Sequence, residues 1–224
     1  MQRWAEATLT LFPDTLADLR KGNWVGPIGR RALARVAQAE ARRRLGLAAK
    51  APVLLLVGGS QGARDLNEFA AALLPQLAGT GYQLLALTGA GKAEPLRAAC
   101  ALHRLPAVVL ERLTDMGLAY SAADAALSRG GAATIAELWL FHLPAAIAPY
   151  PHHKDRQQEH NARALGPGAL LLPRLDRDDA AALLALLRSP QRLRSMAEHL
   201  RASAPAEGGQ RAADFLEETA RARA

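Results

Sequence analysis

From residue 52 onward, short apolar runs alternate with longer segments of helical periodicity. No other feature limits the fold as strongly, because strands and helices that alternate in this way form a parallel sheet through right-handed crossovers. The pattern predicts strands at 52–57, 82–88, 107–110, 124–128, 145–148 and 169–172, and helices at 63–77, 94–103, 116–121, 132–141 and 156–165. The first strand is continuously apolar, as expected of a strand buried on both faces. The sequence therefore predicts an α/β fold with a doubly wound parallel sheet.

Outside this region the periodicity is helical. Residues 31–45 are amphipathic and rich in arginine, which predicts a helix after a turn at 26–29. The chain after Asp176 is also helical in pattern. Asp176 and Asp178 resemble the acidic motif of metal-dependent glycosyltransferases, but their place just before a helix favours an N-cap with acids at the positive end of the helix dipole.

The composition is that of an ordinary globular protein, with 50% hydrophobic and 22% charged residues. The single cysteine, Cys100, excludes an internal disulfide, favours a reducing cytoplasm and lies in an apolar helix, where we expect it in the core. The net charge of +7, carried almost wholly by arginine, suits nucleic acid, anionic lipid or phosphorylated ligands. Aromatic residues make up only 4% of the chain, too few for a platform on which bases stack. We therefore expect no nucleic-acid partner and favour an anionic ligand or a membrane surface.

No part of the chain has the pattern of a membrane-spanning or secretory segment. The start lacks the apolar region and cleavage site of a signal peptide. The longest uncharged stretch, residues 69–91, is interrupted by proline, glycine and glutamine, so it predicts a helix, a turn and a strand.

The first informative motif is the glycine-rich segment at 58–64, between a predicted strand and a predicted helix. Glycines let the backbone approach a phosphate closely, and a helix start offers free N–H groups. Ligands of open α/β sheets bind at this kind of place, outside the carboxyl ends of the strands. The segment matches neither the dinucleotide fingerprint nor the P-loop pattern, so an ordinary strand-to-helix turn is an alternative.

A second glycine pair, Gly130 and Gly131, opens the helix predicted at 132–141. The hydroxyl of Thr134 can contact a phosphate there, and Glu137, one turn later, can accept hydrogen bonds from a ribose diol. The alternative is a simple cap, with Glu137 solvated near the helix start.

The third motif is a polar, proline-stiffened loop at 149–161 that enters a helix. Its amides, Gln157, Gln158 and Asn161, suit recognition of sugar hydroxyls. Its histidines, two adjacent and one seven residues later, do not have a known metal-ligand spacing, so we expect no metal site.

Together these segments resemble the MurG family, the peptidoglycan UDP-N-acetylglucosamine (UDP-GlcNAc) transferases of glycosyltransferase family 28. The matching residues are GGSQGAR at 58–64 with Asn67, LTDM at 113–116 with Tyr120, RGGAATIAE at 129–137, and HKDRQQ at 153–158 with Asn161. Their order and spacing agree as well, and the resemblance covers about residues 4–220. Gly130 stands where the family more often has serine.

The resemblance implies a GT-B glycosyltransferase, which has two Rossmann-like domains with the active site between them. It implies that this chain is the C-terminal, donor-binding half, with residues 1–30 as an inter-domain hinge remnant, 31–204 as the UDP-GlcNAc-binding domain and 205–224 as a C-terminal helix or tail. The N-terminal acceptor domain, whose glycine-rich loop carries the proposed general base, has no counterpart here. No catalytic residue is therefore expected in this chain.

For the nucleotide, the resemblance implies contacts at both glycine motifs. Gly59, Ser60 and Gln61 would contact the diphosphate, and Leu113 would meet uracil through its backbone. An arginine would neutralise the phosphate; Arg30 is the expected residue, with Arg31 as the alternative because the segment departs from the family by one residue.

The second glycine motif and the polar loop would bind the rest of the donor. Ala132, Ala133 and Thr134 would form the helix start under the α-phosphate, and Glu137 would bind the ribose. The N-acetylglucosamine would be bound by the three amides, Gln157, Gln158 and Asn161.

The function implied is inverting transfer of N-acetylglucosamine to lipid I in peptidoglycan synthesis, without cofactor or metal. The partners implied are UDP-GlcNAc, a lipid-linked acceptor held by the N-terminal domain, and the inner face of the cell membrane, on which a cytoplasmic enzyme would be peripheral. We also expect self-association through the apolar stretch at 4–24. Two alternatives remain open: the donor subunit of a two-chain transferase, and a non-catalytic nucleotide-sugar binding module.

Overall fold

A parallel sheet of six strands forms the centre of the molecule. The computed structural model describes residues 5, 7–19, 21–29, 33–59, 61–152, 155–204 and 208–222. The sheet has the order β5-β4-β3-β6-β7-β8, all strands parallel. Its strands are β3 Val53–Val57, β4 Gln83–Leu87, β5 Ala107–Leu110, β6 Ala125–Ser128, β7 Ala145–Ile147 and β8 Ala169–Leu171. The chain proceeds from β3 toward one edge, then returns beside β3 at β6 and proceeds toward the other, so the sheet is doubly wound and of the Rossmann type.

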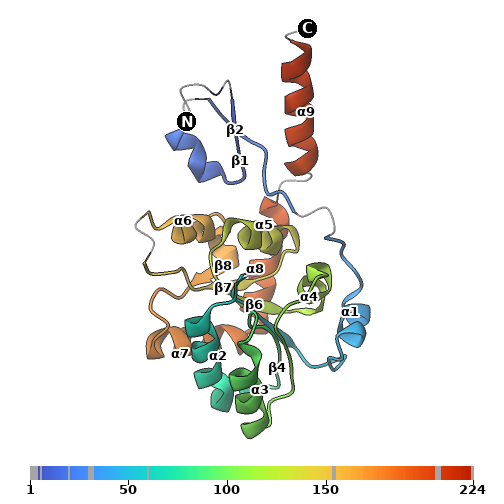
Figure 1. The fold of residues 1–224 in the computed structure, drawn as a ribbon, viewed down its shortest axis with the longest axis vertical. Helices are drawn as coiled ribbons and strands as arrows, with labels where there is room; N and C mark the ends of the chain where they lie inside the picture. Colours follow the sequence, from blue (N-terminus) through green and yellow to red (C-terminus); the bar gives the residue numbers. More distant parts are fainter. Residues whose placement is uncertain are drawn as a thin grey trace.

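Helices cover both faces of the sheet because each strand is apolar on both sides (Figure 1). One core lies against α2 (Arg64–Leu77), α3 (Ala93–Leu102) and α7 (Arg177–Leu187). The other lies against α4 (Met116–Ala122), α5 (Ala132–Leu140) and α6 (Gln157–Arg163). Helix α8 (Pro190–Ser203) contributes side chains to both cores.

All strands predicted from residue 52 onward are confirmed, and so are the helices between them, with ends that differ by a few residues. The predicted Asp176 cap is also confirmed, because its carboxylate accepts hydrogen bonds from the N–H groups of Asp178 and Asp179. Cys100 is buried, as expected.

The helix predicted at 31–45 is wrong in its first part. Helix α1 runs only from Gln38 to Arg44, residues 33–37 are not helical, and residues 30–32 lie outside the described part of the chain. The Val36 N–H donates to Ser121 Oγ at 3.2 Å. A Cβ on Gly117 would lie 2.4 Å from the Ala34 carbonyl oxygen, so the segment packs directly on α4. This packing outweighs the local helical periodicity.

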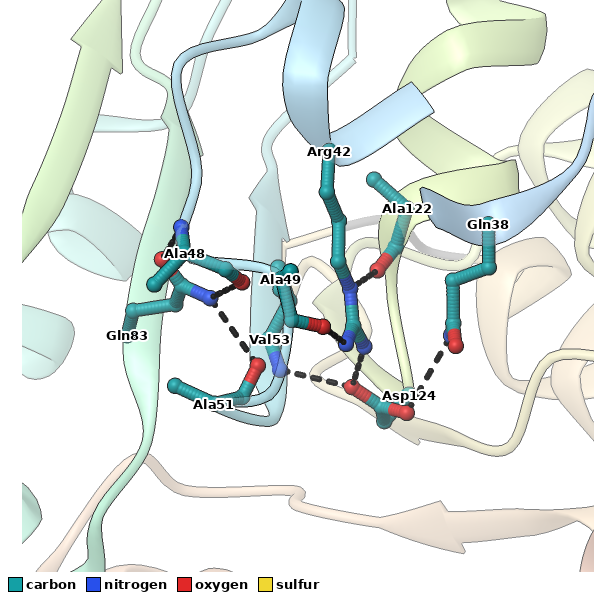
Figure 2. A network of polar contacts seen from close by, with 9 residues as sticks. All are labelled: Gln38, Arg42, Ala48, Ala49, Ala51, Val53, Gln83, Ala122 and Asp124. Carbon is teal, nitrogen blue, oxygen red and sulfur yellow. Dashed lines mark hydrogen bonds and ion pairs between the residues drawn. The ribbon is translucent and has the colours of Figure 1, made fainter. Parts of the chain in front are cut away.

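An ion pair between buried Arg42 and half-buried Asp124 attaches α1 to the start of the sheet (Figure 2). Arg42 Nη2 lies 2.6 Å from Asp124 Oδ2, and the same oxygen accepts the Val53 N–H at 2.7 Å. Arg42 also donates to the carbonyl oxygens of Ala122 and Ala49, at 3.0 and 2.7 Å. The network joins α1 to the residues that precede β3 and β6.

The N-terminal residues form a small unit of their own. Strands β1 (Thr8–Thr10) and β2 (Gly22–Trp24) pair in parallel around the 3-10 helix Pro13–Asp18. They lie beside α9 (Gly208–Arg221), which extends away from the sheet (Figure 1), and Arg211 packs over the Trp24 ring at 5.5 Å. Phe12, in the stretch expected to drive self-association, is buried. Self-association stays a prediction, with less apolar surface to drive it than the sequence indicates.

In the part of the chain that the structure describes, no helix is both long and apolar enough to span a bilayer.

Candidate functional site

Three loops meet at the carboxyl edge of the sheet, beside the point where the strand order reverses between β3 and β6. They are the glycine-rich segment after β3, the Arg129–Gly131 segment after β6 and the loop after β7. Ser128 Oγ donates to the Val57 carbonyl oxygen at 3.0 Å, and this bond holds the end of β6 against the end of β3. Ligands of doubly wound sheets bind at such a switch point.

Two cavities open there, one on each side of the start of α5. The first, here the loop cavity, measures about 570 Å³ and is lined by the glycine segment, the start of α2, Arg129 and the loop after β7. The second, the α4–α5 cavity, measures about 520 Å³ and is lined by the β5–α4 connection, α4 and α5. Gly59 and Thr134 line both cavities, so the two adjoin.

The glycine segment has a backbone that other residues do not adopt easily. Gly59 and Gly62 have φ of 83° and 65°, in the left-handed region. A Cβ on Gly62 would lie 2.0 Å from the Thr88 carbonyl oxygen, so this glycine lets the loop pack against the end of β4. Lys92 Nζ donates to the Gln61 carbonyl oxygen at 2.7 Å and brings a positive charge to the loop. Ser60 lies outside the described residues.

The start of α5 points its first N–H groups at the junction of the cavities. Gly131 is the N-cap residue and provides no side-chain cap, and the first intrahelical bond runs from the Ile135 N–H to the Gly131 carbonyl oxygen. The N–H groups of Ala132, Ala133 and Thr134 therefore have no partner within the helix. Such a helix start, with its positive dipole end, suits an anion.

Glu137 is the buried carboxylate of the α4–α5 cavity. Its exposed fraction is 2%, and Oε2 accepts a 2.7 Å hydrogen bond from the Tyr120 hydroxyl. The alternative of a solvated capping residue is therefore wrong for Glu137. Leu113 lines the same cavity beside Met116, which gives it an apolar wall.

The predicted amides of the third motif differ in their positions. Gln158 lines the loop cavity, and its Oε1 accepts N–H groups from Tyr150 at 2.9 Å and Gly130 at 3.3 Å. Asn161 is buried and donates through Nδ2 to the Gly130 carbonyl oxygen at 2.9 Å. Gln157 is exposed and lines neither cavity. Gln158 and Asn161 thus fix the second glycine motif against α6, and their contact with a sugar stays a prediction.

Arg129 and Asp65 are functional candidates that the sequence analysis did not single out. Arg129 is buried, pairs with Asp65, and donates through Nη1 to the Ala148 carbonyl oxygen at 2.8 Å. Burial works against ionisation of Asp65, but the hydrogen bond and the positive charge of Arg129 outweigh it and hold the Asp65 pKa below its usual value. Both residues line the loop cavity. The sequence contains one indication of Arg129, because this arginine belongs to the RGG motif and directly follows a predicted strand.

Arg30 lies outside the described residues, so its role as the phosphate arginine stays a prediction. The described residues contain no group of three or more His, Cys, Asp or Glu side chains close enough to hold a metal ion. The described site therefore combines backbone N–H donors, the buried carboxylate of Glu137 and the amide of Gln158, an arrangement that can bind a phosphorylated sugar ligand.

Comparison with known proteins agrees with this chemistry. The family model for the glycosyltransferase family 28 C-terminal domain matches residues 53–212. A UDP-N-acetylglucosamine–N-acetylmuramyl-(pentapeptide) pyrophosphoryl-undecaprenol N-acetylglucosamine transferase of Acidothermus cellulolyticus is 41% identical over 198 residues, which are 83% of this chain and 52% of that protein. The transferase of the same name from Hahella chejuensis is 36% identical, over 92% of this chain and 58% of that protein. The chain thus spans a little over half the length of these relatives.

Solved structures lead to the same family. The crystal structure of Acinetobacter baumannii MurG matches with a TM-score of 0.76 and 27% identity, over 96% of this chain and 61% of that one. The calicheamicin glycosyltransferase CalG4 matches with a TM-score of 0.59 at 20% identity, over 95% of this chain and 51% of that one, and shares the fold alone. The expected Rossmann-like half of a GT-B fold is confirmed. The chain belongs to the glycosyltransferase family 28 C-terminal domain family.

Proposed function

We propose that this chain binds UDP-GlcNAc as the donor for transfer of N-acetylglucosamine to a lipid-linked acceptor in peptidoglycan synthesis. The observation that carries the proposal is the pair of adjoining cavities that meet at Gly59 and Thr134. A nucleotide sugar has two bulky ends joined by a diphosphate, and the site has two cavities joined at a helix start. The names of the similar transferases supply the donor sugar and the undecaprenol-linked acceptor.

In this arrangement the nucleoside occupies the α4–α5 cavity. Its ribose hydroxyls donate to the Glu137 carboxylate, and its uracil packs beside Leu113. The diphosphate lies at the junction, against the N–H groups of Gly59, Gln61, Ala132, Ala133 and Thr134. The sugar lies in the loop cavity, which Gln158 lines, with Gln157 and Asn161 of the same helix as the further proposed contacts. Ser60 and Arg30 complete the diphosphate site.

The proposed reaction inverts the configuration at the anomeric carbon. A hydroxyl of the acceptor attacks that carbon, the bond from the carbon to the β-phosphate oxygen breaks, and UDP leaves with the bonding electrons. Free N–H groups at the start of α5 stabilise the charge that develops on the leaving diphosphate. We place the acceptor site and the general base in a separate N-terminal domain, and the reaction at the inner face of the cell membrane. Residues 1–30 then act as the hinge, 31–204 as the donor domain and 205–224 as the C-terminal helix or tail.

Calorimetric titration of UDP-GlcNAc into the 224-residue chain tests the proposal. We expect one binding site per chain, with the same affinity in EDTA and in Mg²⁺, because N–H groups and arginine rather than acidic clusters face the diphosphate. Absence of binding would refute the donor role, and a tenfold gain in affinity with Mg²⁺ would refute the metal-independent mode. A transfer assay with lipid I is a second test. Because we place the acceptor site and the general base in a separate domain, we expect the chain alone to form no product.

A further inference from the structure

A third groove lies at the opposite, amino edge of the sheet. It measures about 690 Å³, within the range of small-molecule sites. One wall consists of residues that come just before four strands: Pro52, Tyr82, Asp124 and Pro144. The five-residue strand β3 separates this edge from the candidate donor site by roughly 17 Å, at about 3.3 Å per residue. The groove is therefore distinct from both cavities described above.

The charge of the groove is positive. Arg188 and Arg194 line its other wall, are exposed, and have no acidic partner among the residues that the structure describes. The one carboxylate in the lining, Asp124, is paired with Arg42 at 2.6 Å and also accepts the Val53 N–H (Figure 2). Two arginines thus remain to attract an anion.

Tyr82 adds a hydrogen-bond donor to the groove. Its exposed fraction is 6%, and its hydroxyl has no hydrogen-bond partner within the described part of the chain. Burial and the negative charge of Asp124 raise the pKa of Tyr82 to about 12, so the phenol stays protonated at neutral pH. The hydroxyl belongs to the groove lining, so a ligand in the groove can accept its hydrogen bond.

The rest of the lining is apolar except for Thr80, whose hydroxyl donates to the Leu77 carbonyl oxygen at 2.6 Å. Pro52 and Pro144 lie on the strand side, and Leu187, Pro190 and Leu193 on the helix side. Pro190, Arg194 and Ala197 follow one another at helical spacing, so α8 presents one continuous stripe to the groove. We propose that this groove binds an organic anion with a compact apolar body, its charge held by Arg188 and Arg194 and its polar edge by Tyr82.

The test uses 1-naphthyl phosphate as the probe and measures its binding to the full chain by calorimetry. Inorganic phosphate lacks the apolar body, and 1-naphthalenemethanol lacks the charge. The double variant Arg188→Gln/Arg194→Gln removes both groove cations. The matched control, Arg177→Gln/Arg192→Gln, changes the net charge equally at exposed arginines of α7 and α8 that do not line the groove. Tyr82→Phe removes only the hydroxyl.

We expect the groove variant to bind the probe at least tenfold more weakly than wild type, and Tyr82→Phe to bind it a few-fold more weakly. The control variant should bind within twofold of wild type, and both reference compounds should bind at least tenfold more weakly than the probe. Equal losses in the groove and control variants would contradict the proposal, as would unchanged binding in the groove variant. UDP-GlcNAc titration of the groove variant separates this site from the donor site, because its affinity for the donor should stay at the wild-type value.

Discussion

The Tyr120 hydroxyl donates a 2.7 Å hydrogen bond to Oε2 of Glu137, and both side chains are at least 97% buried. Tyr120 lies on α4 and Glu137 on α5, so the bond joins two helices that form opposite sides of the α4–α5 cavity. A buried carboxylate oxygen that lacks a hydrogen-bond donor is costly to the fold. The bond fixes the carboxylate where we place the ribose.

Tyr120→Phe should therefore lower both stability and nucleotide affinity. Removing a hydrogen bond to a charged group costs about 1.5–3 kcal/mol, and we expect a loss of this size in the free energy of unfolding. UDP should bind a few-fold more weakly because Glu137 is less firmly held. Urea unfolding and UDP titration measure the two effects. Tyr82→Phe is the matched control at the other edge of the sheet, and an equal loss of UDP affinity there would contradict a specific role for Tyr120.

Gln158→Glu separates the two functions of this side chain. The new carboxylate keeps an oxygen that can accept the N–H groups of Gly130 and Tyr150, so the loop should retain its structure. The variant loses the NH₂ donor, which is the group available to a sugar hydroxyl. We expect UDP-GlcNAc to bind several-fold more weakly while UDP binds as in wild type. Gln158→Ala removes both functions and should also lower the melting temperature. Equal weakening of both ligands by Gln158→Glu would contradict the sugar contact.

The two glycines of the first motif should differ in their tolerance of a side chain. Gly62→Ala adds a Cβ 2.0 Å from the Thr88 carbonyl oxygen at a φ of 65°, so strain and overpacking together should cost about 2–5 kcal/mol of stability. Gly59→Ala meets nothing within 4 Å and should cost only about 1–2 kcal/mol, the price of its positive φ. Denaturant unfolding without ligand measures both. A larger loss at Gly59 than at Gly62 would contradict the described loop.

The pH dependence of stability should include a contribution from His142. Burial, with the positive charges of Arg35 and Arg201, lowers the His142 pKa from 6.5. The unfolded chain therefore binds more protons in mildly acidic solution, and stability falls as the pH drops below about 6.5 toward the lower folded pKa. The carboxylates with lowered pKa, Asp65 and Asp176, titrate below this window.

His142→Asn should make this loss shallower between pH 7.5 and 5. Asparagine tolerates the φ of 51° at this position, so the backbone can stay as it is. Unfolding curves at several pH values measure the slope, with His160→Asn as the control for removal of a histidine. A slope as steep in His142→Asn as in wild type would show that His142 does not contribute.

Much of the fold follows from local patterns. Val53–Val57 and the five strands after it are predicted because a parallel strand buried on both faces is apolar throughout, and the helices between them have the spacing of an apolar face. The two glycine motifs can also be predicted from local sequence. A positive φ or a close approach of two backbones requires glycine, and each motif has its glycines within a few residues.

The parts that escape prediction depend on contacts between distant residues. Arg42 and Asp124 are 82 positions apart, and nothing near either residue indicates their pairing. The helix at α1 is shorter than its periodicity predicts because Val36 donates to Ser121, 85 positions away. The hydrogen bonds of Gln158 to Tyr150 and Gly130 likewise depend on where α6 packs, so the sequence shows an amide available for a sugar but not the structural function that the amide also has.

Titration of UDP into wild type, Glu137→Gln and Glu137→Ala tests whether the nucleotide binds in the α4–α5 cavity with its ribose on Glu137. Glu137→Gln keeps the size of the side chain and removes the charge, so it controls for the cavity that alanine leaves. Near-ultraviolet circular dichroism confirms that each variant is folded. Because hydrogen bonds to a charged acceptor are worth about 1.5–3 kcal/mol, UDP and UDP-GlcNAc should each bind Glu137→Ala about tenfold or more weakly than wild type. Glu137→Gln keeps a neutral acceptor, so both ligands should bind it several-fold more weakly. Wild-type affinity for UDP in folded Glu137→Ala would place the nucleotide outside the α4–α5 cavity.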